Sequence, residues 1–107
     1  MIKFWLQKIC TAMTFEAFCQ SLSLSEPPDL PPLLKALWYD ANGDWNAAHN
    51  IAQDEYTREG SLVHAYLHRK EGDEWNAGYW YRKAHKTMPH SPLQEEWEQL
   101  VRYFLTV

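Results

Sequence analysis

Hydrophobic positions along this chain recur at helical spacing, and no stretch alternates in the way that a strand requires. Phe15, Phe18 and Leu22 keep the i, i+3, i+7 positions of one helix face, and later apolar runs follow the same period. Paired prolines between residues 27 and 32 predict a stiff connector, because proline removes a backbone donor and restricts its neighbour. Helices are predicted at residues 14–23, 32–42, 44–55, 62–71 and 74–87 and after Pro92. The expected fold class is therefore all-α.

A short motif occurs twice, 29 residues apart: a small residue, a Gly-Asp pair and a second small residue. The first copy is Ala36, Gly43, Asp44 and Ala48, and the second is Ala65, Gly72, Asp73 and Ala77. In each copy the glycine ends one helix and the aspartate caps the next, while the alanines let the two helices approach closely. The duplication predicts two pairs of antiparallel helices, with the first and last helices covering the ends.

The second copy extends into a longer pattern, made of Gly72-Asp73, Ala77, Tyr81, Ala84 and Pro89. This pattern resembles the second half of a tetratricopeptide (TPR) motif. Gly43, Asp44 and Ala48 fit the same motif, although Ala52 stands where an aromatic residue is usual. The resemblance implies antiparallel helical hairpins stacked as a short TPR-like right-handed array with capping helices, and it implies partner binding. Residues 36–45, 63–69 and 76–84 are also similar to a group of small bacterial proteins of unassigned function.

Composition narrows the class of protein. A length of 107 residues fits one domain, and a net charge of −4 argues against a nucleic-acid partner. No apolar run is long enough to cross a bilayer, so no membrane contact is expected. Two cysteines make neither a disulfide framework nor a zinc knuckle, which favours the cytoplasm. Residues 1–13 are expected to be an N-terminal extension of uncertain status, and residues 14–107 a single TPR-like domain.

The helix predicted at 62–71 carries the sharpest candidate site. His64, His68 and Glu71 lie at i, i+4 and i+7 and therefore share one helix face. Two imidazoles and a carboxylate are a ligand set that zinc could use, but a metal needs further ligands that the sequence does not identify. A polar ligand or partner site and plain helix packing are the two alternatives. No metal or other cofactor is assigned.

The helix predicted at 74–87 carries a second candidate. Trp75, Tyr79 and Arg82 fall on the side opposite its apolar face, with Lys86 one turn further on. Aromatic rings beside cations suit a protein interface, because these residue types dominate interface energetics. The alternative is that the last helix covers Trp75 and Tyr79 through Trp97.

No Gly-rich phosphate loop and no nucleophile–base set can be assembled from the sequence, so no enzyme is expected. The predicted function is a small non-enzymatic interaction module, either an adaptor or a self-associating subunit, with a protein or peptide partner. The alternative function is binding of a metal or small ligand through His64, His68 and Glu71.

Overall fold

The computed structural model describes residues 13–107, and within that range every regular element is a helix. The all-α prediction is therefore confirmed for the described part, which holds no strand. Residues 1–12, most of the expected extension, lie outside it. The helices are α2 (Phe15–Ser21), α3 (Pro32–Ala41), α4 (Trp45–Gln53), α5 (Arg58–Lys70), α6 (Glu74–Lys83) and α7 (Leu93–Thr106). Within residues 13–107, each helix is too short or too polar to traverse a bilayer.

The two Gly-Asp corners adopt the same geometry. Gly43 has a φ of 83°, which glycine adopts without strain, and the amide of Asp44 donates to the carbonyl of Tyr39 at 2.9 Å. The carboxylate of Asp44 then accepts from the amide of Ala47 at 3.0 Å and so caps α4. The second corner repeats these contacts with Gly72, Asp73, His68 and Asn76. At each corner only three residues thus separate the end of one helix from the start of the next.

Helix α5 begins earlier than predicted. Thr57 caps it through a hydrogen bond of 2.9 Å from the amide of Gly60, so the helix starts at Arg58 rather than near Leu62. Gly60 therefore does not break the helix but lies inside the first turn of α5. It is buried there against the backbone of Glu55, in a space that would not hold a Cβ atom.

Helix α6 ends earlier than predicted, at Lys83. The following His85 has a φ of 59° and takes the position that Gly43 and Gly72 occupy at the other corners. The amide of Lys86 then donates to the carbonyl of Tyr81 at 2.9 Å, which closes the helix end. The predicted helix was too long because no sequence pattern reliably identifies a histidine with a positive φ.

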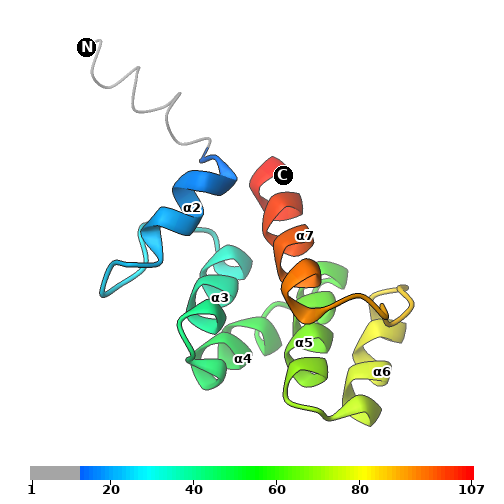
Figure 1. The fold of residues 1–107 in the computed structure, drawn as a ribbon. Helices are drawn as coiled ribbons and strands as arrows, with labels where there is room; N and C mark the ends of the chain where they lie inside the picture. Colours follow the sequence, from blue (N-terminus) through cyan, green and yellow to red (C-terminus); the bar gives the residue numbers. More distant parts are fainter. Residues whose placement is uncertain (1–12) are drawn as a thin grey trace, which may run out of the picture.

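Helix α5 is the central element (Figure 1). It packs against α6 and α4, while α3 packs against α4, and α7 lies across both α3 and α5. Helix α5 is buried along nearly its whole length, from Gly60 to His68 apart from Leu62. The main core draws on five helices and the connector before α3; its largest members include Phe18, Leu37, Trp38, Tyr66, Leu67, Trp97 and Phe104.

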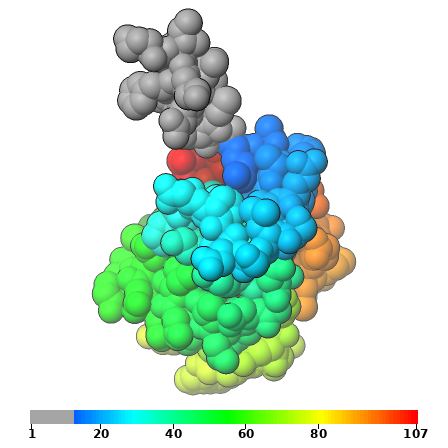
Figure 2. Space-filling model, turned by 90° about the vertical axis from the view of Figure 1, so that its left-hand side faces the viewer, coloured from blue at the N-terminus to red at the C-terminus, as the bar shows by residue number. Residues whose placement is uncertain are grey.

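Helix α2 packs against α7 through aromatic side chains. The rings of Phe15 and Phe18 lie 6.1 Å and 6.0 Å from that of Trp97, whose Nε1 donates to the carbonyl of Leu37. Seen from the side, the chain descends from α2 through α3 to the later helices, with α7 visible behind (Figure 2). The alternative in which the last helix covers Trp75 and Tyr79 through Trp97 is therefore not found. Trp97 faces α2 and α3, and within residues 13–107 α7 makes no backbone approach to α6.

Two buried carboxylates join the helices. Asp40 on α3 accepts from the hydroxyl of Tyr66 and from Nζ of Lys70, both at 2.9 Å. Glu96 on α7 accepts from the hydroxyl of Tyr81 and from Nη1 of Arg69, both at 2.6 Å. Arg69 also donates to the carbonyl of Ser91. The basic residues Arg69 and Lys70 at the end of α5 therefore pair with buried carboxylates.

These networks predict a specific alkaline response. Burial, followed by the neighbouring carboxylates, raises the pKa of Tyr66 and Tyr81 above the ordinary 10.0. Because the folded state holds these protons more tightly, their contribution to stability is complete below about pH 10 and is lost as the pH rises further. Tyrosinate absorbance and far-ultraviolet circular dichroism are measured together from about pH 9 to about pH 12. Ionisation of Tyr66 and Tyr81, seen in the absorbance, is expected to coincide with the loss of helical signal. Ionisation of all six tyrosines while the helical signal stays native would contradict this prediction.

Candidate functional site

Three histidines meet where α5 packs against α4 on one side and α6 on the other. His64 and His68 share one face of α5, as the sequence predicts, and α4 adds His49, which the sequence analysis did not connect to them. Each imidazole contributes one nitrogen to a group in which all three atoms lie within 4.8 Å of one another. The ring centroids are 4.5 Å apart for His49 and His64, and 4.9 Å apart for His64 and His68. We call His49, His64 and His68 the histidine cluster.

Two tryptophans enclose the histidine cluster. Trp45 stacks on His49 at 4.7 Å between ring centroids, and its Nε1 donates to the carbonyl of Leu67 at 2.8 Å. Trp80 stacks on His64 at 4.0 Å with the two planes 16° apart. These indoles restrict the rotation of both imidazoles, so the cluster is held in place from two sides.

Burial keeps His49 and His64 neutral. His64 and His68 are 5% and 9% exposed, whereas His49 is half-buried. Burial lowers the pKa of His64 from 6.5 to about 4, with a further contribution from His49 and His68 because protonated imidazoles repel one another. Burial also lowers the pKa of His49. At neutral pH, His49 and His64 are therefore uncharged imidazoles.

Glu71 lies beside the cluster rather than inside it. Its Oε2 is 2.8 Å from Nδ1 of His68, and its side chain is 38% exposed. The carboxylate favours the tautomer of His68 that carries its proton on Nδ1, which leaves Nε2 with a free lone pair. The structure thus brings together the predicted residues His64, His68 and Glu71, with Glu71 as a hydrogen-bond acceptor.

A hollow leads to the histidine cluster from the surface. It has a volume of about 520 Å³, and His64 and Trp80 form part of its wall. Its rim comes from the α4–α5 connector and from the end of α6, with Glu55, Tyr56, Lys83 and His85. His64 can therefore be reached from solvent although its ring is buried.

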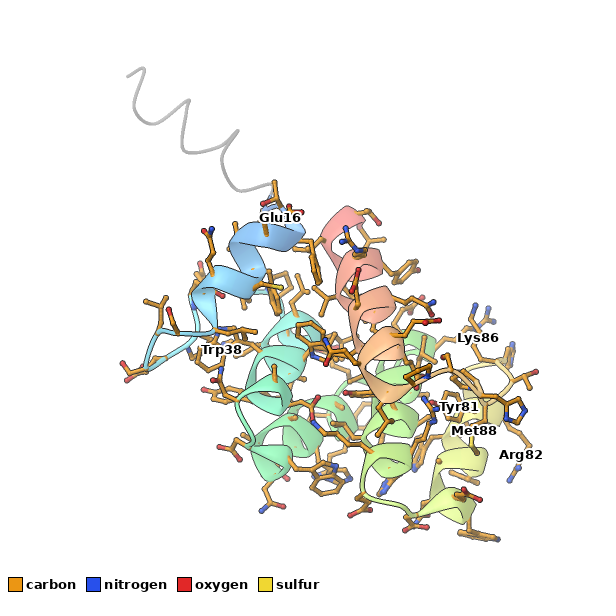
Figure 3. The ribbon with its side chains drawn as sticks, viewed as in Figure 1. Glu16, Trp38, Tyr81, Arg82, Lys86 and Met88 are labelled. Atoms are coloured by element: carbon orange, nitrogen blue, oxygen red, sulfur yellow. The ribbon has the colours of Figure 1, made fainter. Side chains whose placement is uncertain are left out.

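The outer side of α6 carries the second group of predicted residues. Trp75 is 77% exposed and Tyr79 is 41% exposed, and Arg82 and Lys86 are exposed as well. In Figure 3, Tyr81 points from α6 toward the rest of the molecule, whereas Arg82 lies on its outer edge. We call Trp75, Tyr79 and Arg82 the α6 outer face. The structure places these three residues together, apart from the histidine cluster.

Sequence reasoning missed His49 because its contact with α5 is tertiary. The available indication was local: Trp45 and His49 stand four residues apart on α4, so an aromatic pair shares one face of the helix.

The comparisons with known proteins add no assignment: no family model matches the chain, and no curated protein or solved structure matches it either.

Proposed function

We propose that this chain is a small, non-enzymatic cytoplasmic module that binds an acidic segment of a protein partner through the α6 outer face. In this proposal the two helix pairs, α3 with α4 and α5 with α6, form a short TPR-like right-handed array. Helices α2 and α7 are its caps. The matching geometry of the corners at Gly43 and Gly72 supports that arrangement.

The observation that carries the proposal is the exposure of Trp75. A tryptophan with 77% of its surface in water is uncommon, because indole is among the largest apolar side chains. Tyr79 lies one turn along the same face, so two rings are presented together. Aromatic residues of this kind are the usual anchors of protein interfaces. A partner that covers both rings would remove apolar surface that the described residues leave exposed.

The charges around the α6 outer face favour an acidic partner. Arg82, Lys83 and Lys86 are all exposed near the end of α6. Nζ of Lys83 lies 5.7 Å from the centre of the Tyr79 ring, so cationic and aromatic groups are interleaved. A segment with an aliphatic side chain followed by carboxylates would match this order of groups.

Binding by displayed peptides tests the proposal. Peptides selected from a random library against the wild-type protein are expected to share carboxylates beside an aliphatic residue. Trp75→Ala combined with Arg82→Ala is expected to weaken their binding about thirtyfold, which corresponds to the loss of about 2 kcal/mol at an interface anchor. Affinity is also expected to fall with added salt, because exposed charges are screened. Fluorescence anisotropy of a labelled peptide measures both effects.

Tyr103→Ala provides the matched control, since Tyr103 is 46% exposed but lies on α7. It is expected to bind the peptides as the wild type does, and all variants are expected to keep their helical content. Peptides without a common acidic pattern, or equal binding by the double variant, would reject the proposed site. Sedimentation of the protein alone tests the homo-oligomer: a dimer that the double variant abolishes would show that a second copy occupies this face instead.

A further inference from the structure

We propose that His49, His64 and His68 together bind one divalent transition-metal ion of the zinc type. The site is independent of the α6 outer face and of any partner. Imidazole nitrogen is a preferred ligand of zinc, copper, nickel and iron, whereas carboxylate and carbonyl oxygens suit magnesium and calcium. A set of three nitrogens therefore selects a transition metal over the common hard cations.

The positions of the three nitrogens are close to what coordination requires. Zinc binds imidazole at about 2.0–2.1 Å, so two ligands of a tetrahedral site lie roughly 3.3 Å apart. The three nitrogens of the cluster lie within 4.8 Å of one another. Each pair thus needs to close by about 1.5 Å at most to reach this separation.

The ligands come from helices that are already fixed in place. His64 and His68 are four residues apart on α5, so one helical turn sets their separation. His49 on α4 approaches from the other side, with ring centroids 4.5 Å and 5.2 Å from those of His64 and His68. The stacked indoles of Trp45 and Trp80 hold the outer faces of the cluster. Little conformational freedom remains to be lost when the ion binds.

Glu71 acts as a positioning residue for this site. A metal-binding histidine commonly donates its second ring N–H to a carboxylate, which fixes its tautomer and orientation. The contact of 2.8 Å between Nδ1 of His68 and Oε2 of Glu71 has this arrangement. With the proton of His68 on Nδ1, its Nε2 would carry the lone pair that binds the ion.

The fourth coordination position of the ion would be filled by water or another ligand from solvent. His64 forms part of the wall of the hollow of about 520 Å³, and the rim residues Glu55 and His85 are not in the group of ligand atoms that lie within 4.8 Å of one another. Three protein nitrogens with one position open to water are typical of zinc sites that bind an exogenous ligand. The hollow would admit a small anion or water to the ion.

Metal titration of tag-free protein tests the site. Calorimetry with zinc chloride, after treatment with a chelator, is expected to show one bound ion per chain. Cobalt(II) is expected to give the intense visible absorption of a tetrahedral site with nitrogen ligands. A hundredfold excess of zinc over the dissociation constant is expected to raise Tm by about 10 °C. Wild-type protein that shows neither heat nor the cobalt spectrum would overturn the proposal.

Single variants assign the ligands. His49→Gln is expected to weaken zinc binding more than tenfold and to change the cobalt spectrum, since it removes one of three nitrogens. His90→Gln is the matched control, because His90 is exposed and lies outside the cluster, and it is expected to bind as the wild type does. Equal affinity of His49→Gln and the wild type would overturn the three-histidine site.

A second variant keeps the test decisive if replacement of a cluster histidine disturbs packing. Glu71 follows the last turn of α5 and is exposed, so Glu71→Ala is expected to fold normally. It is expected to weaken zinc binding about 10- to 100-fold while keeping one ion per chain. Unchanged affinity in Glu71→Ala would overturn the role of this carboxylate, and with it the orientation of His68 that the site requires.

Discussion

Replacing Arg69 by methionine is expected to lower the free energy of unfolding by about 3–5 kcal/mol, which is a large part of the stability of a domain this size. Arg69 and Glu96 are 15% and 6% exposed at their side chains, and 2.6 Å separates their charged atoms. Methionine fills a similar volume but leaves the Glu96 carboxylate buried without a counter-charge. Urea unfolding followed by circular dichroism measures the loss.

Two further variants separate charge from packing. Arg102 pairs with Glu98 on the same helix, but the side chains are 53% and 42% exposed, so Arg102→Met is expected to cost less than about 1 kcal/mol. Adding Glu96→Gln to Arg69→Met removes the isolated charge, while the Tyr81 hydroxyl can still donate to residue 96. The double variant is therefore expected to regain stability. A double variant as unstable as the sum of its two single changes would show that the charge is not the cause.

Gly60→Ala is expected to destabilise the fold by about 2–4 kcal/mol, although alanine is the better helix former. A Cβ atom at this position would lie 2.1 Å from the backbone oxygen of Glu55 and 2.7 Å from its Cβ. Backbone cannot move aside as a flexible side chain can, so α5 or the α4–α5 connector must shift. Thermal unfolding measures the effect, with a clear drop in Tm expected.

Gly78→Ala is the matched control, because both glycines lie inside helices. The nearest atom to an added Cβ at Gly78 is Nη1 of Arg82 at 3.4 Å, the end of a long and exposed side chain. The substitution is therefore expected to stabilise α6 by up to about 1 kcal/mol, through helix propensity alone. A similar change in Tm for both variants would mean that Gly60 is not held by close packing.

Local chemistry explains which parts of the fold could be predicted. The corners at Gly43-Asp44 and Gly72-Asp73 were found because a left-handed glycine and an aspartate cap act within a few residues of sequence. The start of α5 was misplaced because glycine is a poor helix former, whereas Gly60 lies inside the helix and allows a close approach to Glu55. Only the three-dimensional packing distinguishes these two roles of glycine.

The candidate sites, too, could be predicted only in part from the sequence. Helical periodicity placed His64 and His68 on one face and Trp75 and Tyr79 on another, and both groupings are present in the structure. Periodicity along one helix carries no information about which other helix lies opposite. His49 therefore remained unconnected to the other two histidines, although all three are in one cluster.

The packing of α2 on α7 has a consequence for how the protein is made. A ribosome releases the chain from its N-terminal end, so α7 is the last of the described helices to emerge. Until then α2 keeps only its contact with α3, where Nε1 of Trp38 donates to Ser21, and the sides of α3 and α5 that α7 covers are open to water. The nascent chain therefore exposes this apolar surface until α7 emerges. Packing of Phe15 and Phe18 against Trp97 waits for α7 to leave the ribosome.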